Sequence, residues 1–357
     1  MKHLRGHRRG LAALAAVALA VSACGGDDDD AADTPVDTPA DTAAPSADTT
    51  APDADTTAPE PEAVCETALN EDNSVASLSE LDFSGLEINV GSKDFVEQFV
   101  LGSLAIVALE EGGATVTDST NLGGTVVNRE ALEAGEIDLY FEYNGTGWTV
   151  HLANEDPSFD REELTLGVCA DDLEQNGMRW LGVSDFNNTY GFATAGDGPA
   201  AGLDLQGMME YVNENPDATV CMETEYPNRP DGLVLLEEAT GLTIPAGQDQ
   251  ILDTGVIYEE TANGNCTFGE IFTTDGRIAA LGLDIIDDPG VNILYNVSMT
   301  MPDDVYQQAP EAFEALADTL LGPLDNETMA GLNARVSDGG EDPIDVARSF
   351  LVDQGLL

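Results

Sequence analysis

The stretch Leu86–Gly113, "LEINVGSKDFVEQFVLGSLAIVALEEGG", contains the pattern that decides the fold. Its first six residues are typical of a β-strand. The remainder has the length and composition of a helix, and we expect Asp94 as its N-cap with Glu97 three residues later, as in a capping box. The glycine pair 112–113 predicts where the helix ends. A strand that leads directly into a long helix is a building unit of α/β proteins.

Strands and helices alternate in the same way along the rest of the chain. The expected strands are 114–120, 136–143, 178–183, 190–195, 219–225, 268–274 and 292–299. The expected helices are 124–135, 160–176, 203–214, 231–240, 309–320, 326–336 and 342–354. This order predicts βαβ units and mostly parallel sheets. About 270 ordered residues are many for a single core, so we expect two lobes.

The N-terminal residues 1–23 have the features of a secretory signal peptide. A basic segment precedes the apolar run Leu11–Val21, which is shorter than the ~20 residues needed to cross a bilayer core. The next residues, "VSAC", resemble the lipobox of bacterial lipoproteins, in which Cys24 carries the lipid. The alternative is an ordinary secretory signal with a chance cysteine. We expect an extracytoplasmic protein, lipid-anchored to the outer face of the bacterial cell membrane.

Residues 24–63 consist largely of Asp, Thr, Pro and Ala. Such a composition cannot form a core and predicts a disordered acidic tether. Residues 64–83 would then be a lead-in to the folded part.

The chain is strongly acidic, with 68 Asp and Glu against 12 Lys and Arg and a net charge of −56. Removal of residues 1–23 would leave 8 basic residues and a net charge of −60. This charge argues against nucleic acid as a partner and against binding to an anionic membrane surface. Solubility in high salt is the simplest explanation for it.

Four cysteines remain if Cys24 carries a lipid: Cys65, Cys169, Cys221 and Cys266. An even number in an exported chain favours two disulfides, and four cysteines allow three pairings. We favour Cys221 with Cys266, because both begin strand-like runs, which leaves Cys65 with Cys169. Their wide spacing matches no zinc site, so we expect no bound metal.

Lys93 is the one lysine that would remain after removal of residues 1–23. It lies where the first expected strand meets the first expected helix, and ligands of open α/β sheets bind at such places. A lysine is unfavourable beside the positive end of a helix. With the free amides of that end, however, it makes an anion site. The alternative is that Lys93 pairs with one of the many surface acids.

The sequence contains no catalytic motif. G-x-S-x-G, Walker A and H-E-x-x-H patterns are all absent. His3 and His7 would leave with the signal peptide, and we expect His151 to be a surface or packing residue. We therefore expect neither an enzyme nor a cofactor.

Six motifs together resemble the substrate-binding proteins of osmoprotectant ABC importers, which bind glycine betaine, choline, carnitine or proline betaine. They are "NVGSKDFVEQFVLG", "NLGGTVVNREALEAGEIDLYFEYNGTG", "FNNTYGFAT", "YPNRPDGL", "FTTDGRIAALGL" and "LNARVSDGGEDPIDVARSFL". They occur in the order expected for the family, and the resemblance covers roughly residues 84–357.

The resemblance implies a two-lobed class II periplasmic-binding-protein fold with a ligand cleft between the lobes. Lobe one would comprise residues 84–187 and 293–357, and lobe two residues 188–292. The implied partners are a quaternary amine and the transmembrane subunit of an ABC permease, and we expect a monomer. A receptor of the same fold for another cationic or amino-acid-like solute is the alternative.

The chemistry of such a ligand explains the residues that the resemblance implies. A quaternary ammonium has no N–H donor, so it is held by aromatic faces through cation–π attraction. A carboxylate prefers Lys, Arg and hydroxyl groups. The implied cation side comprises Tyr143, Tyr190, Phe272 and Tyr295, together with Asn188, where some members carry an aspartate. The implied carboxylate side comprises Lys93, Thr146 and Arg229. For Asp275 and Arg277 we expect an internal ion pair.

Overall fold

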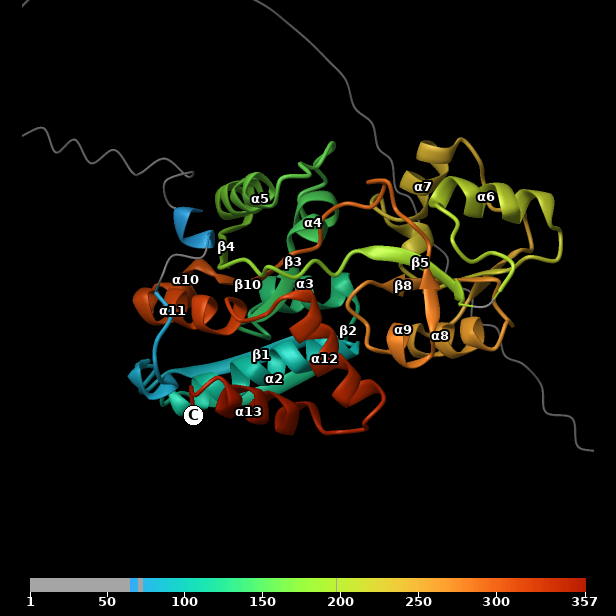
Figure 1. Cartoon of the computed structure of the whole chain (residues 1–357). Coiled ribbons are helices and arrows are strands. Elements are labelled where there is room, and N and C mark those ends of the chain that lie inside the picture. The colour runs from blue at the N-terminus through green and yellow to red at the C-terminus, as the bar shows by residue number, and fades with distance from the viewer. Residues whose placement is uncertain (1–64, 70–72, 197) are drawn as a thin grey trace, which may run out of the picture. The chain divides into compact units, whose positions relative to one another are not determined.

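The computed structural model describes residues 65–69, 73–196 and 198–357 (Figure 1). The predicted signal peptide, the predicted lipidation site Cys24 and the predicted tether lie outside the described residues. Within the described part, no helix has both the length and the hydropathy needed to span a membrane.

The first group of strands forms the sheet of lobe one. Its members are β1 (Glu87–Lys93), β2 (Thr115–Gly123), β3 (Tyr140–Tyr143), β4 (Met178–Leu181) and β10 (Val297–Pro302). Strand β1 pairs with β2 in parallel, and a parallel bridge between Val90 and Leu139 joins β1 to the segment leading into β3. Strand β10 lies between β3 and β4 and runs antiparallel to both. The resulting order is β2-β1-β3-β10-β4.

The sheet of lobe two repeats this arrangement. Its members are β5 (Tyr190–Ala195), β6 (Val220–Met222), β7 (Asp249–Ile251), β8 (Phe268–Phe272) and β9 (Leu283–Ile285), in the order β7-β6-β8-β5-β9. Strand β6 is parallel to β7 and β8, and β5 is antiparallel to β8 and β9. The fourth strand in each order, β10 in lobe one and β5 in lobe two, is the strand that the chain enters after crossing from the other lobe.

The α/β fold expected from the sequence is therefore confirmed, but the expectation of mostly parallel sheets is wrong. Each sheet has two parallel and two antiparallel strand pairings. The reason is topological: the crossover strands β5 and β10 arrive from the opposite lobe and insert against the direction of their neighbours. The short strands β7 and β9 and the helix α8 were not expected, and both strands have only three residues.

Helices cover the sheets and connect the strands. They are α2 (Val96–Glu111), α3 (Thr125–Glu133), α4 (Asn144–Thr146), α5 (Arg161–Asn176), α6 (Leu205–Glu214), α7 (Leu233–Thr240), α8 (Thr254–Ala262), α9 (Arg277–Ala280), α10 (Asp303–Tyr306), α11 (Pro310–Leu321), α12 (Asn326–Ser337) and α13 (Pro343–Asp353). Short turns occur at η1 (Cys65–Ala68), η2 (Leu78–Glu80), η3 (Gly147–His151) and η4 (Tyr226–Asn228).

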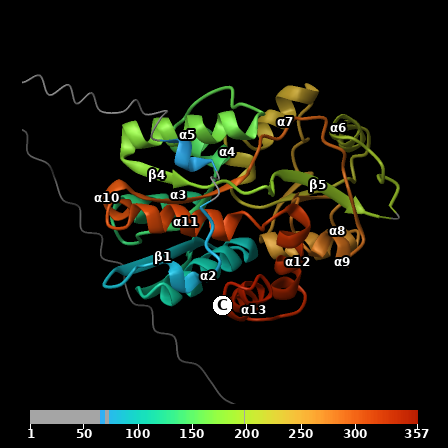
Figure 2. The ribbon, with the colours of Figure 1, turned by 60° about the vertical axis from the view of Figure 1, so that its left-hand side comes forward.

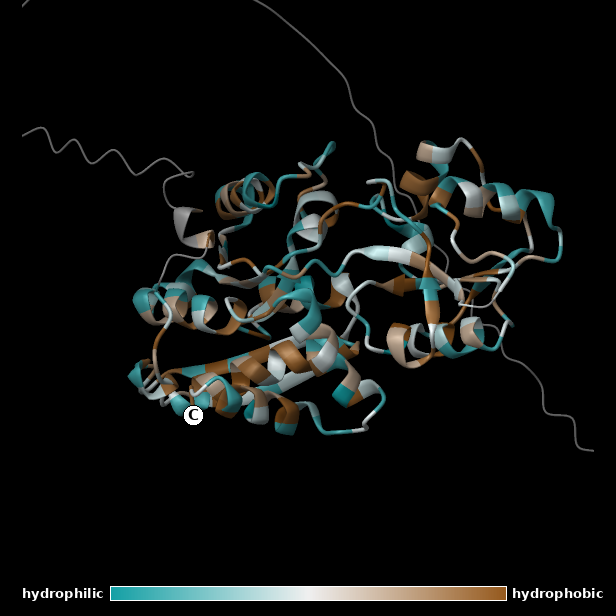
Figure 3. Cartoon of the chain, viewed as in Figure 1, coloured by the Kyte–Doolittle hydropathy of each residue, from teal (hydrophilic) through white to brown (hydrophobic). Residues whose placement is uncertain are grey.

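Helix α2 is the central helix of lobe one, and its start differs from the prediction. Phe95, rather than Asp94, occupies the N-cap position, and no side chain caps the helix there. Twelve of the 16 residues of α2 are buried, because α11, α12 and α13 and the strands β1 and β2 pack against it (Figure 2). Its hydrophobic colouring in Figure 3 is typical of a helix enclosed by other elements. Glu97, the expected capping-box residue, is buried and has other partners, described below.

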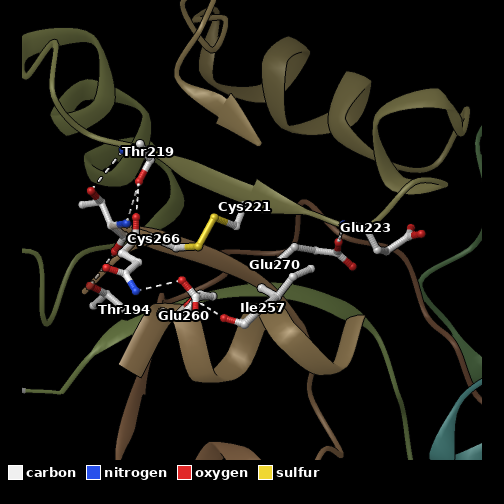
Figure 4. The surroundings of a disulfide bond; sticks show 11 residues. Thr194, Thr219, Cys221, Glu223, Ile257, Glu260, Cys266 and Glu270 are labelled. Carbon is white, nitrogen blue, oxygen red and sulfur yellow. Dashed lines mark hydrogen bonds between the residues drawn. A yellow bond between two sulfur atoms is a disulfide. The ribbon is translucent and has the colours of Figure 1, made fainter. Parts of the chain in front are cut away.

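Two disulfides connect distant segments. Cys65 in η1 is bonded to Cys169 in α5, and Cys221 in β6 is bonded to Cys266, which lies just before β8 (Figure 4). This is the pairing that the strand context favoured. The Cys221–Cys266 bond lies near the buried carboxyl groups of Glu223 and Glu270, which are labelled in Figure 4.

Candidate functional site

A cavity of about 480 Å³ is lined by residues of both lobes. Its wall contains all eight residues that the sequence analysis placed at a ligand: Lys93, Tyr143, Thr146, Asn188, Tyr190, Arg229, Phe272 and Tyr295. The antiparallel crossover strands explain part of this convergence. Tyr190 begins β5 and lies opposite Phe272 at the end of β8. In the other lobe, Tyr143 at the end of β3 lies opposite the start of β10, two residues after Tyr295.

Five aromatic side chains form a closed circuit in the cavity wall. In order, this aromatic cluster is Phe95, Tyr143, Tyr295, Tyr190 and Phe272, and neighbouring ring centroids lie 5.2 to 6.3 Å apart. On a regular pentagon with such sides, each centroid would be about 5 Å from the centre, within the ~6 Å over which a ring attracts a cation. The sequence analysis missed Phe95, because it read as an ordinary residue at the start of a helix.

A buried carboxylate lies behind the aromatic cluster. Glu97 is 2% exposed and accepts hydrogen bonds from the Tyr143 hydroxyl and the Asn188 amide, each at 2.8 Å. Its other oxygen accepts from Thr274 and Asn333. No ion pair with a basic side chain is found for Glu97 in the described part of the chain. Burial raises the pKa of Glu97 despite these four hydrogen bonds.

Asn188 thus supports a carboxylate instead of supplying one. The sequence analysis noted that some members of the family carry an aspartate at this position. Here the Asn188 side chain donates to Glu97, and its own oxygen accepts from the Thr274 amide. The negative charge at this end of the cavity therefore comes from helix α2.

Lys93 lies at the other end of the cavity, where it contacts a buried acid. Its Nζ is 2.6 Å from Oε1 of Glu142 and donates to the Thr125 hydroxyl at 3.1 Å. Nζ also lies 5.1 Å from the centroid of the Tyr143 ring. Burial alone would raise the pKa of Glu142, but the Lys93 ammonium and the bond to His151 lower it to about 2. Lys93 therefore lines the cavity and pairs with a fully buried acid, whereas the alternative from the sequence was a pairing with a surface acid.

His151 is part of the same buried network. Its Nε2 lies 3.0 Å from Oε2 of Glu142, and its side chain is almost fully buried. The expectation of a surface or packing residue did not include this contact. The pairing joins positions nine residues apart across a β-strand end and the π-turn η3, which no local pattern in the sequence indicates.

Arg229 connects the two lobes. Its guanidinium forms two hydrogen bonds to Asp231, each at 2.8 Å, and also donates to Thr146 at 3.0 Å and to Thr125 at 3.2 Å. Its Cζ lies 5.6 Å from the centroid of the Tyr190 ring. Asp231 in turn accepts from the hydroxyl groups of Thr149 and Tyr295 in lobe one, both at 2.7 Å. These contacts hold the cavity walls together from both sides.

Asp275 and Arg277 form the ion pair expected of them. Arg277 also lines the cavity and lies over the Tyr258 ring, with 4.2 Å between Cζ and the ring centroid. In the described ranges, no group of three or more His, Cys, Asp or Glu side chains is arranged to hold a metal ion.

Comparison with known proteins places this chain in a family. Residues 87–353 match OpuAC, described as the substrate binding domain of ABC-type glycine betaine transport system. The glycine-betaine-binding protein of Pseudomonas aeruginosa is 32% identical over 280 residues, which cover 76% of this chain and 88% of that protein.

Solved structures agree with this match. The structure of apo YehZ from Escherichia coli superimposes with a TM-score of 0.57 at 29% identity, covering 76% of this chain and 99% of that one. A structure described as a glycine betaine/carnitine/choline ABC transporter gives a TM-score of 0.61 at 22% identity and covers 74% and 98% of the two chains. The second likeness supports the two-lobed fold. The chain belongs to the family of substrate-binding domains of ABC-type glycine betaine transport systems.

Proposed function

We propose that this protein is an extracytoplasmic receptor that captures a small quaternary ammonium osmoprotectant of the glycine betaine type and delivers it to an ABC permease. Binding proteins of ABC importers work outside the cytoplasm, together with a transmembrane permease. The aromatic cluster is the observation that carries the proposal. Five rings around one space, with a buried carboxylate behind them, suit a cation that cannot donate hydrogen bonds.

The proposal assigns a role to each half of the cavity. The aromatic cluster acts as a cage for the ammonium group, supported by Asn188. Lys93, Thr146 and Arg229 line the other half, which faces the remainder of the ligand. Lobe one would be residues 84–187 and 293–357, and lobe two residues 188–292, with ligand exchange through hinge motion between them. Binding proceeds without turnover.

Calorimetric titration with glycine betaine, choline, carnitine and proline betaine tests the proposal. We expect heat of binding with at least one of them. Tyr143→Ala and Tyr190→Ala should each weaken binding by up to about 30-fold, because one cation–π contact contributes up to ~2 kcal/mol. Tyr211→Ala is a matched control, since Tyr211 packs against Phe268 and does not line the cavity. Absence of binding across the panel would refute the proposal.

A second candidate is a receptor of the same fold for another cationic or amino-acid-like solute. Two residues favour it. Phe272 keeps an aromatic face but has no hydroxyl, and Asn188 has no charge where some members of the family carry an aspartate. Mass spectrometry of the ligand that co-purifies with the full chain decides between the two. A quaternary amine supports the first candidate, and any other cation supports the second.

We also propose that Cys24 carries the lipid anchor and that residues 24–63 form the tether of a monomeric receptor. Cys24→Ser should release the protein from the membrane fraction without changing its affinity for the amine. Retention of the variant in that fraction would contradict the anchor.

A further inference from the structure

A carboxylate of the protein already lies in the charged part of the cavity, where a ligand carboxylate would be expected. We call the space beside Thr125 and Arg229 the anion position. Glu225, which follows β6 in lobe two, accepts hydrogen bonds from the backbone N–H and the hydroxyl of Thr125 in lobe one, both at 2.9 Å. Arg229 Nη1 lies 3.2 Å from the same carboxylate. Thr125 is the first residue of α3, so Glu225 lies at the N-terminus of a helix, where a negative charge is favourable.

Gly124 provides the space for this contact. A Cβ atom at position 124 would lie 2.0 Å from Oε1 of Glu225, far inside van der Waals contact. The backbone at Gly124 has φ −74°, which any residue can adopt, so glycine is not required by the local conformation. What glycine permits here is the close approach of the carboxylate.

The surrounding charges leave no place for a second anion. Burial alone would raise the pKa of Glu225, but Lys93, Thr125 and Arg229 lower it below its usual value. Lys93 already contacts the buried Glu142, and Arg229 contacts the buried Asp231. Two basic groups therefore face three carboxylates, and the Thr125 hydroxyl accepts from both basic groups while donating to Glu225. An additional carboxylate would be repelled unless one of the three moved away.

Glu225 is the carboxylate that can move. Its side chain is 33% exposed, whereas those of Glu142 and Asp231 are 0% exposed. A ligand that carries a carboxylate must displace Glu225 from α3 and Arg229 in order to reach Lys93. A ligand with an uncharged tail leaves these contacts intact.

We infer that Glu225 stands in for a ligand carboxylate and makes the site selective for quaternary amines without one, of which choline is the simplest probe, over glycine betaine. This inference rests on the proposed function and specifies its ligand class. Glu225 is a specificity-determining residue that also joins the two lobes, because its hydrogen bonds cross from lobe two to lobe one.

The test compares calorimetric dissociation constants for choline and glycine betaine. The unmodified protein should bind choline at least tenfold more tightly. Glu225→Ala should reduce that preference at least tenfold, because the anion position becomes free for the carboxylate of glycine betaine. Gly124→Ala is an independent variant whose Cβ would expel the Glu225 side chain and also fill the anion position itself, so glycine betaine should gain nothing and the preference for choline should persist.

Two matched controls accompany these variants. Glu238→Ala removes an exposed acid of α7, and Gly331→Ala adds a Cβ where nothing lies within 4 Å. Neither should change the preference, and thermal unfolding confirms that every variant is folded. An unmodified protein without a preference for choline, a preference unaltered in Glu225→Ala, or a preference lost in Gly124→Ala overturns the inference alone. Failure of the unmodified protein to bind any amine of the four-member panel overturns the proposed function as well.

Discussion

The two halves of the cavity differ in whether their charged groups already have a partner of opposite charge. The aromatic half is the aromatic cluster with Glu97 behind it, and the charged half contains Lys93, Thr146 and Arg229. In the aromatic half, Glu97 is buried with four hydrogen-bond donors, and no ion pair involves it within the described residues. In the charged half, Lys93 and Arg229 each lie within 3 Å of a carboxylate whose side chain is fully buried. The carboxylate of the aromatic half therefore has no ion-pair partner among the described residues, whereas both basic groups of the charged half already have one.

This difference indicates which end of a ligand supplies the affinity. A buried carboxylate without a counter-charge is costly, and a cation that enters the aromatic cluster would relieve that cost. A basic group that already has a buried partner gains little from a second anion. The presence of Lys and Arg in a cavity is thus insufficient to predict an anionic ligand until their existing partners are known.

The largest expected effect concerns Arg229, and it tests whether the charged half is mainly structural. Arg229→Met would leave Asp231 buried without its partner, and removal of one member of a buried ion pair typically costs 3–5 kcal/mol. We expect the free energy of unfolding, measured by urea denaturation, to fall by about 3 kcal/mol. Arg229→Lys should not restore it, because lysine cannot reproduce the two-pronged contact with Asp231.

Arg348→Met is the control for this measurement, because Arg348 is exposed on α13. If Arg229→Met were as stable as this control and lost only ligand affinity, the charged half would serve mainly to bind ligand and not to stabilise the fold. The comparison between the two halves would then have to be reversed.

Much of the fold could be predicted from the sequence, because its signals are local. The length, the composition and the terminal glycines of this stretch placed helix α2 within two residues of its observed limits. The helices near the C-terminus were similarly indicated by their own composition. The three-residue strands β7 and β9 carry too few residues for any pattern. The antiparallel course of β5 and β10 depends on where the chain crosses between lobes, which neighbouring residues do not encode.

Part of the cavity lining could be predicted from the sequence, but the contacts of its residues could not. The eight predicted residues line the cavity because the motifs that contain them lie at strand ends, and the topology brings those ends together. Their partners are another matter. Glu142 is 49 positions from Lys93, and Glu225 is 100 positions from Thr125. In a chain with 68 acidic residues, no sequence signal distinguishes these two carboxylates from the others.

A smaller effect is expected from the pH dependence of ligand binding, and it sharpens the account of the aromatic half. Burial raises the pKa of Glu97 in the free protein, and a bound cation would lower it again. Binding should therefore release a proton. Affinity for choline should decline as the pH falls through the range between the two pKa values, by at most about tenfold per pH unit. Calorimetry in buffers of different ionisation enthalpy measures the proton released.

Glu97→Gln should make the affinity for choline independent of pH over that range. The variant keeps an acceptor for Tyr143 but carries no charge, so it should bind choline more weakly than the unmodified protein at neutral pH. A pH profile unchanged by the substitution would show that Glu97 does not titrate on binding. Glu97 would then not distinguish the aromatic half from the charged half.

The smallest expected effect lies in lobe two, at Glu270, which does not line the cavity although its neighbour Glu223 does. Burial and the neighbouring Glu223 raise the pKa of Glu270, whose carboxylate accepts from the Glu223 amide at 2.7 Å (Figure 4). A carboxyl with a raised pKa in the folded state contributes stability at pH values below its unfolded pKa of about 4.3, and this contribution is lost as the pH rises through the folded pKa. Glu270→Gln should therefore increase Tm at pH 7 by on the order of 2 °C.

The same substitution should not change the loss of stability that occurs at acid pH. Glu142, whose pKa is lowered to about 2, contributes stability above pH ~4.3 that is lost as the pH falls toward its folded pKa. The two carboxyls thus act in separate pH windows, one above and one below the pKa of an unfolded glutamate. In thermal unfolding between pH 3 and pH 8, Glu270→Gln should weaken the pH dependence of Tm only above pH ~4.3. A change in the lower window would indicate that lobe two and the charged half of the cavity titrate as a single network.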